Sequence, residues 1–202
     1  EYSALTAAGA LELTDAARLV RRRGQAMQSA VPVGEGAMAA IIGLDYGKVE
    51  TIAREASGEM VCQAANDNSE GQIVISGHAG AIDAAIALAS EAGAKRALKL
   101  PVSAPFHSSL MAPAAEVMAQ ELADTDIRPP CVPVVSNITA QGVSDPHDIR
   151  RLLVDQITGT VRWRESVQWM RAQGVEEMTE IGAGKVLSGL VRRIEKDVAA
   201  ES

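Results

Sequence analysis

The hydrophobic pattern changes its period at Gly36, and the element order that follows restricts the fold more than any other feature of the chain. From there the pattern predicts strand, helix, strand, then again strand, helix, strand. The expected strands are 37–44, 61–66, 72–77 and 96–103, and the expected helices are 46–56 and 79–92. Asparagine and glycine in 66–72 predict the turn between the central strands. This β-α-β-β-α-β order is that of a ferredoxin-like module, which we place at 34–104.

The flanking segments predict a second body of helices and strands. Helices are expected at 1–9 and 14–30, the second capped by Thr14 and Asp15. After the module we expect helices at 113–123, 146–157, 164–173 and 185–199, and strands at 132–136 and 175–181. Their alternation favours a parallel sheet covered by helices. The module is then an insertion in an α/β body formed by 1–33 and 105–202. Because Glu1–Leu5 already looks helical, we expect a further segment upstream.

Composition excludes several classes of protein. A hydrophobic fraction of 47% is enough for a sizeable core. The net charge of -7, without clustered cations and aromatics, argues against nucleic-acid binding. No signal peptide or membrane span is recognisable. Cys62 and Cys131 lie in apolar, strand-like segments without metal-ligand spacing, which indicates two reduced core thiols in a cytoplasmic protein and no metal site.

His107 is the candidate catalytic base. It ends the segment Pro101-Val-Ser-Ala-Pro-Phe-His107, whose two prolines stiffen the approach to a predicted helix. The helix start disfavours a charged imidazole, so the ring is expected to be neutral and able to accept a proton near pH 7. A lone histidine is more often a surface residue or a satisfied core residue, and His78 and His147 fit those interpretations. No Gly-x-Ser-x-Gly elbow occurs, so the nucleophile is not among these residues.

Arg23 is the candidate substrate-binding cation. On helix 14–30 it shares a face with Leu19 and Met27 at four-residue spacing, with Val20 beside them. A buried guanidinium needs a partner, either a carboxylate of the protein or a ligand carboxylate held by two hydrogen bonds. Alternatively, the side chain reaches water from the edge of the apolar stripe.

Seven stretches of the chain form a specific pattern in their order and spacing: Glu1-Tyr-Ser-Ala-Leu5, Arg23-Gly-Gln-Ala-Met-Gln28, Gly36-Ala-Met-Ala-Ala-Ile-Ile-Gly-Leu44, Asn66-Asp-Asn-Ser-Glu-Gly-Gln72, Pro101-Val-Ser-Ala-Pro-Phe-His107, Pro133-Val-Val-Ser-Asn137 and Glu180-Ile-Gly-Ala-Gly-Lys185. Together they resemble the malonyl-CoA:acyl carrier protein transacylase family, which includes the acyltransferase domains of fatty-acid and polyketide synthesis. The likeness spans essentially the whole chain. It implies an α/β-hydrolase-like body, incomplete in this chain, with an inserted ferredoxin-like subdomain. It also implies an upstream segment with a Gly-His-Ser-x-Gly elbow that carries the nucleophile.

The resemblance also assigns roles to residues. His107 is implied to be the general base, with Gln156 orienting it through its main-chain carbonyl. Arg23 is implied to bind the carboxylate of a malonyl group. Phe106 and Met27 are implied to line the same pocket. The implied contacts with coenzyme A or the carrier arm are Asn66, Asn68, Lys95 and Arg96.

The activity implied is ping-pong transfer of malonyl from malonyl-CoA to the phosphopantetheine thiol of acyl carrier protein, in fatty-acid biosynthesis. No metal or bound cofactor is implied. Three alternatives remain: an acyltransferase domain of a polyketide synthase, a serine hydrolase with a similar body, and a catalytically incomplete fragment that docks the carrier protein. The arginine and the inserted module favour acyl transfer over hydrolysis.

Overall fold

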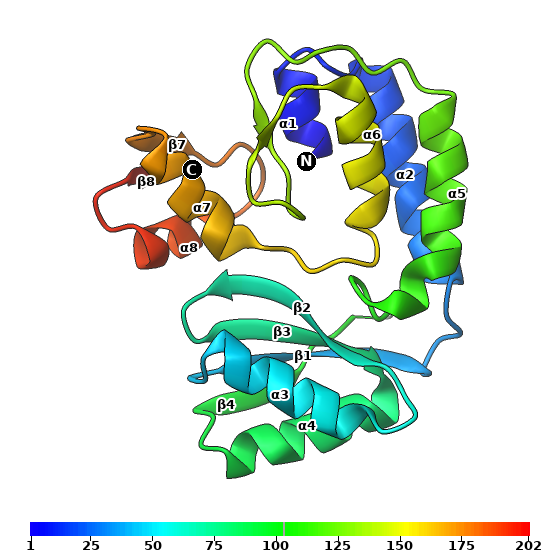
Figure 1. Ribbon diagram of the computed structural model, residues 1–202, viewed down its shortest axis with the longest axis vertical. Helices are drawn as coiled ribbons and strands as arrows, with labels where there is room; N and C mark the ends of the chain where they lie inside the picture. Colours follow the sequence, from blue (N-terminus) through cyan, green and yellow to red (C-terminus); the bar gives the residue numbers. More distant parts are fainter. Residues whose placement is uncertain (103) are drawn as a thin grey trace.

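A four-stranded antiparallel sheet with two helices on one face forms the lower half of the mixed α/β fold in Figure 1. The computed structural model describes residues 1–102 and 104–202. The strands are β1 (Gly36–Ile42), β2 (Cys62–Ser69), β3 (Gln72–His78) and β4 (Arg96–Lys99), and the helices are α3 (Tyr46–Ser57) and α4 (Ala79–Glu91). The sheet order β2-β3-β1-β4 is that of a ferredoxin-like module, as the sequence predicted.

The two faces of this sheet belong to different cores because side chains alternate along a strand. Ala39 and Ile41 of β1 and Ile75 of β3 join the core under α3 and α4. Met38 and Val74 point the other way and pack with the half-buried Phe106. The sheet therefore has one face for its own helices and one for the rest of the chain.

Gly77 of β3 gives a test of this packing. A Cβ atom there would lie 2.0 Å from the main-chain oxygen of Val61, which cannot move without breaking the sheet. We expect Gly77→Ala to lower the free energy of unfolding by about 1–3 kcal/mol or more. In Gly80→Ala, the matched control in α4, the new Cβ meets only the Met60 side chain at 3.6 Å. That variant should be neutral or more stable by up to about 1 kcal/mol. Equal denaturant midpoints for the two variants would contradict the packing described.

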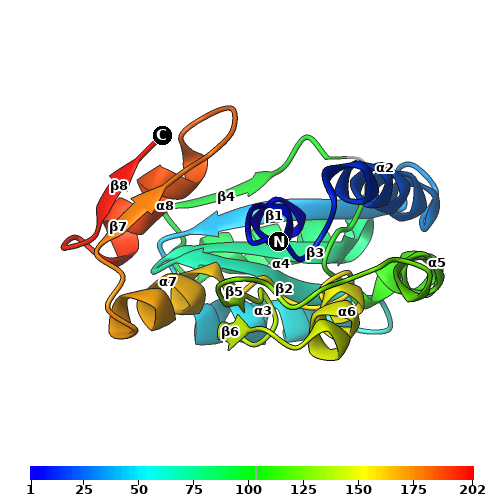
Figure 2. The same cartoon turned by 90° about the horizontal axis from the view of Figure 1, so that it is seen from above.

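The upper half of the molecule is helical. Its helices are α1 (Tyr2–Ala7), α2 (Leu13–Ser29), α5 (Ala112–Ala123) and α6 (Pro146–Asp155), with a short 3-10 turn at Ser109–Met111. Figure 2 shows α2 and α5 running together at one end of the molecule, and Arg18 and Arg22 of α2 both bind Glu121 of α5, at 2.8 and 2.9 Å. These exposed ion pairs link α2 to α5.

Among the described residues, the second body has two separate two-stranded ladders instead of the one parallel sheet that was predicted, and only one of them is parallel. β5 (Val134–Val135) pairs antiparallel with β6 (Gly142–Val143), through a turn in which Ser136 N–H donates to the Gln141 carbonyl. β7 (Glu177–Thr179) pairs in parallel with β8 (Ala199–Glu201). The last predicted helix is shorter than expected, because α8 (Val186–Ile194) ends at Ile194. The chain after it turns back toward β8, and Val198 is buried beside Val191. α7 (Trp163–Ala172) lies between these ladders in sequence.

Smaller corrections concern caps and turns. β2 continues to Ser69, so Asn66 and Asn68 lie in a strand, and the turn is only Glu70 and Gly71, with Gly71 at φ +69°. Helix α2 has Glu12 at its N-cap position and no side-chain cap, whereas Thr14 and Asp15 were predicted to cap it.

The other boundaries follow the prediction more closely. β4 ends at Lys99, and Ser103, which the predicted strand included, lies outside the described residues. The boundaries of the inserted module at 34 and 104 stay a prediction. Within the described part of the chain, no helix combines the length and the apolar character needed to cross a bilayer.

Candidate active site

His107 occupies a tightly constrained turn between β4 and the 3-10 turn. Its φ is +57°, a conformation that is uncommon for a residue other than glycine. The buried Ser108 holds this turn, since its hydroxyl donates to the Pro105 carbonyl at 2.7 Å. Such backbone strain occurs often at functional sites, although Ala140, at φ +54°, shows that it also occurs in ordinary turns.

The hydrogen bond of the His107 ring decides its tautomer. Nδ1 lies 2.8 Å from the main-chain oxygen of Gln156. A carbonyl only accepts hydrogen bonds, so Nδ1 carries the proton, and in the neutral ring Nε2 keeps a free lone pair. Nε2 is therefore the atom of this ring that can accept a proton.

The surroundings keep this ring neutral. Burial lowers the pKa of His107 below its usual value, and the positive charge of Arg23 lowers it further, against the opposing effect of the Gln156 carbonyl. The sequence predicted a neutral ring because a helix starts after it. The lowered pKa of His107 agrees with that prediction, but its largest cause is burial of the ring rather than the helix start.

Arg23 projects from α2 into the same region and is incompletely paired. Its Nη2 donates to the side-chain oxygen of Gln156 at 3.3 Å. Its Nε is buried and, among the described residues, has no hydrogen-bond partner. Burial is the main reason that the pKa of Arg23 is lowered, and the neighbouring Glu1 and Tyr2 partly offset it. None of the ion pairs within residues 1–102 and 104–202 includes Arg23.

The stripe on α2 that the sequence predicted is narrower in the structure. Leu19 and Met27 are fully buried, and Arg23 lies between them, half-buried. Val20, which was predicted to lie beside them, is 50% exposed. The buried face of α2 is therefore one line of side chains, in which Arg23 is the polar member.

Gln156 joins the two candidates. It is the C-cap residue of α6 and only 3% exposed. Its main-chain oxygen meets His107, and its side-chain oxygen meets Arg23. The resemblance implied the first contact. The second was missed, because a glutamine at a helix end gives no sequence signal for where its amide points.

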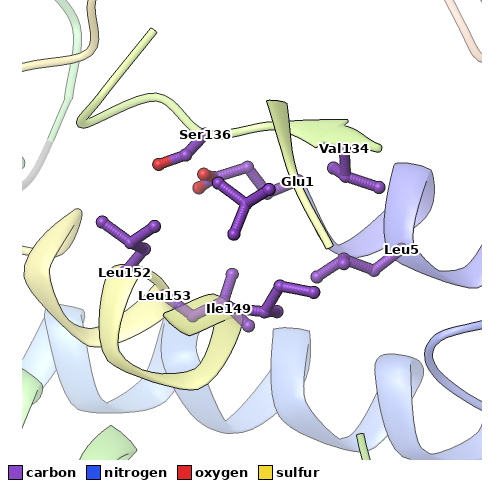
Figure 3. A pocket seen from close by; sticks show the side chains of 8 residues that line it. Glu1, Leu5, Val134, Ser136, Ile149, Leu152 and Leu153 are labelled. Atoms are coloured by element: carbon purple, nitrogen blue, oxygen red, sulfur yellow. The ribbon is translucent and has the colours of Figure 1, made fainter. Parts of the chain in front are cut away.

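Glu1 and Tyr2 complete the surroundings of Arg23, and the sequence assigned neither a role. The Glu1 carboxylate accepts from the Asn137 main-chain N–H at 2.9 Å and from its amide at 3.3 Å. Figure 3 shows this carboxylate near the Ser136 hydroxyl, at a small pocket lined by leucine, isoleucine and valine side chains. Burial raises the pKa of Glu1, and it raises that of Tyr2 to about 12.

An open groove lies where the chain passes between the sheet and the helices, and it includes Phe106, the residue before His107. Its lining residues are Val33, Gly34, Gly36, Pro101, Val102 and Phe106. Gly36 is required here, because a Cβ atom would lie 2.4 Å from the ring of Pro105. Phe106 packs on both the helical core and the outer face of the sheet. Met27, by contrast, is only 1% exposed within the helical core.

A family model described as "Acyl transferase domain" matches residues 1–200. The chain belongs to the acyl transferase domain family. It is 49% identical over 202 residues to the malonyl CoA-acyl carrier protein transacylase of Escherichia coli K12, covering all of this chain and 65% of that protein. It is also 49% identical to the Bacillus subtilis 168 enzyme of that name, over 97% of this chain and 62% of that one. The chain thus spans slightly less than two thirds of these curated relatives.

Solved acyl transferase structures share the fold. The acyl-carrier-protein S-malonyltransferase of Bartonella henselae superimposes with a TM-score of 0.96 at 56% identity, over 99% of this chain and 64% of that one. A malonyl-transacylase in complex with a type II PKS acyl-carrier protein gives a TM-score of 0.97 at 42% identity, over all of this chain and 65% of that chain.

The four implied coenzyme A contacts of this acyl transferase domain fall in two places, two on β2 and two at the start of β4. Asn66 and Asn68 are half-buried on β2, and Asn66 forms a parallel bridge with Val161. Lys95 and Arg96 are exposed, with Arg96 opposite Ile42. That end of β1 is about 20 Å from Gly36, at roughly 3.3 Å per residue. The structure does not bring these two cations together with His107, and the four roles stay predictions.

The cysteines of the acyl transferase domain differ from the expectation in one respect. Both are free; Cys62 is buried, and burial raises its pKa to about 11, but Cys131 is exposed and is not a core thiol. The apolar residues around Cys131 suggested a buried strand, but Val132 is itself 59% exposed. In the described part of the chain, no three histidine, cysteine or acidic side chains are grouped as metal ligands.

Proposed function

We propose that the protein containing this chain transfers malonyl from malonyl-CoA to the phosphopantetheine thiol of acyl carrier protein, in fatty-acid biosynthesis in the cytoplasm. One observation carries the proposal: an imidazole whose Nδ1 is hydrogen-bonded, which leaves Nε2 free, and a guanidinium whose buried Nε is unpaired among the described residues share one residue, Gln156. A proton acceptor beside a carboxylate-binding cation suits an acyl group that ends in a carboxylate. The Escherichia coli and Bartonella henselae relatives carry names that agree with this activity.

The reaction uses His107 twice. In the first half, the hydroxyl of a serine outside residues 1–202 attacks the malonyl thioester, and Nε2 of His107 takes its proton. The carbon–sulfur bond breaks, and the leaving coenzyme A thiolate takes the proton from the imidazolium. In the second half, Nε2 takes the proton of the carrier thiol, which attacks the serine ester. The serine oxygen then recovers its proton from His107. Protein groups and the two substrates supply all the atoms in this scheme.

Arg23 is proposed to select the acyl group. A malonyl carboxylate can accept two of the hydrogen-bond donors that Gln156 leaves unused, Nε among them, whereas an acetyl group leaves Nε buried and unpaired. A site that is complete only with the correct ligand discriminates strongly, because the wrong ligand leaves a buried polar group unsatisfied. Pairing with the malonyl carboxylate also offsets part of the desolvation free energy that burial of the charged guanidinium costs.

The second candidate partner is the acyl carrier protein of a polyketide pathway. One solved neighbour is a malonyl-transacylase bound to a type II polyketide synthase carrier. The chemistry at His107 and Arg23 is the same in both cases. Measuring transfer rates to carriers of both kinds decides which one is the partner.

A transfer assay tests the proposal. The full-length protein is incubated with malonyl-CoA and holo acyl carrier protein, and mass spectrometry measures malonyl-carrier and free malonate. We expect malonyl-carrier to accumulate with little malonate. Malonate without carrier acylation would identify a hydrolase instead. Residues 1–202 alone should transfer nothing, because they lack the serine; transfer by this fragment would contradict the division of the catalytic groups.

The pH profile tests the state of His107. The base works unprotonated, and its pKa is lowered by burial and by Arg23. As pH falls past about 6.5, the usual value for histidine, kcat/KM for malonyl-CoA should therefore stay on its plateau and decline only at lower pH. Replacing Arg23 by alanine removes one cause of the shift and should move this decline upward. A wild-type midpoint at or above 6.5 would contradict the described environment.

A further inference from the structure

A buried ion pair connects the sheet to the other half of the molecule, outside the candidate active site. Asp67 of β2 is 2% exposed. It accepts three hydrogen bonds from Arg164 of α7: Nε donates to Oδ1 at 3.1 Å and to Oδ2 at 2.9 Å, and Nη2 donates to Oδ2 at 2.7 Å. A bidentate ion pair of this kind fixes both the distance and the orientation between the guanidinium and the carboxylate.

The chain just before Arg164 is bound to the same strand at further points. Val161 N–H donates to the Ala65 carbonyl at 2.8 Å, and Asp67 N–H donates to the Val161 carbonyl at 2.9 Å. The Thr160 hydroxyl donates to the Ala64 carbonyl at 2.7 Å. Figure 1 shows this connection, from α6 to α7, passing alongside β2. Thr160 and Val161 thus attach segment 157–162 to β2 through an isolated parallel bridge with Asn66 and the neighbouring hydrogen bonds, and the ion pair lies just beyond its far end.

The near end of the same segment is Gln156. Only four residues separate its carbonyl, which meets His107, from Val161, which meets β2. Gly159 allows this close path, since a Cβ atom there would lie 2.4 Å from the Ile138 side chain. The attachment to β2 and the contacts of Gln156 with His107 and Arg23 therefore lie within one short stretch of chain.

We propose that Asp67 and Arg164 are positioning residues for the acyl transfer reaction: their ion pair holds segment 157–162 on β2, so that Gln156 keeps His107 in its Nδ1–H tautomer and Arg23 in place. The inference rests on the proposed function for its effect on rate, but its structural part concerns the His107 ring alone. Asp67 bears a charge that is buried, and a buried charge left without its partner disrupts its surroundings.

Two substitutions in the full-length protein test the pair. Asp67→Asn removes the charge but keeps the shape, and Arg164→Gln removes the guanidinium, whose side chain is 30% exposed. Nitrogen-15 NMR of the histidine rings reports which nitrogen of His107 carries the proton, and steady-state kinetics report kcat and KM for malonyl-CoA. We expect each variant to lose the single Nδ1–H tautomer and to lower kcat about 10- to 100-fold, with a smaller change in KM. Arg164→Lys, which keeps a cation, should fall between these variants and wild type.

Val49→Ala is the matched control. Val49 is fully buried under the other face of the same sheet and contributes to its core. The Val49→Ala substitution should lower the melting temperature of the protein. At a temperature where the variant is folded, it should leave the His107 tautomer and kcat unchanged. If the Asp67 and Arg164 variants behave like this control, the positioning role is overturned. If wild type transfers no malonyl but the variants still lose the tautomer, the positioning of His107 stands and the proposed function fails.

Discussion

Replacing His107 by alanine is expected to slow acylation of the serine by about 10²–10⁴-fold, the usual contribution of a positioned general base. Nε2 of His107 is the proton acceptor that the hydrogen bond to Gln156 leaves free, and the neutral ring is ready to accept at neutral pH. Without it, the serine proton passes to water. Rapid mixing of the full-length protein with malonyl-CoA, followed by mass spectrometry of the acylated protein, measures this step directly.

His147→Ala is the control for this substitution. His147 lies exposed at the start of α6. Its replacement should leave the acylation rate unchanged. A decrease below about 10-fold for His107→Ala, or equal decreases for the two variants, would show that His107 is not the base.

Replacing Arg23 by alanine is expected to abolish the preference for malonyl over acetyl, changing the ratio of their kcat/KM values by about 10²-fold or more. Malonyl transfer loses a charge-assisted pair of hydrogen bonds. In the variant there is no guanidinium whose buried Nε an acetyl group would leave unpaired, so the rate of acetyl transfer should stay the same or increase. Competition between malonyl-CoA and acetyl-CoA for the same protein, with both products measured by mass, gives the ratio.

Arg22→Ala is the matched control on the same helix. Arg22 is exposed and pairs with Glu121 rather than facing the site. The Arg22→Ala variant should have the same malonyl-to-acetyl ratio of kcat/KM as wild type. An unchanged malonyl-to-acetyl ratio in Arg23→Ala would remove the proposed basis of selectivity, whatever the change in absolute rate.

The sequence predicted the antiparallel sheet well because its signals are local. The short apolar runs of β1 and β3 and the helical periods of α3 and α4 can each be recognised within one short segment, and the element order then leaves few topologies. The second body was predicted less well. Strands such as Val134–Val135 are recognised by composition, but their partners depend on distant segments, which a local pattern does not contain.

The same limit applies to the site. The sequence located His107 and Arg23 because a proline-flanked histidine and an arginine on an apolar stripe are unusual where they occur. It did not indicate that Gln156 connects them through its side chain, nor that Asp67 and Arg164 hold the segment after it. These contacts join residues 97 and 133 positions apart, so only the folded chain shows them.

A crystal structure of the full-length protein with malonyl on its serine is the measurement that tests the central claim most directly. We predict the malonyl carboxylate about 2.7–2.9 Å from the guanidinium nitrogens of Arg23, with Nε2 of His107 facing the ester and Nδ1 still on the Gln156 carbonyl. A malonyl carboxylate bound elsewhere, with the Nε of Arg23 still unpaired, would contradict it.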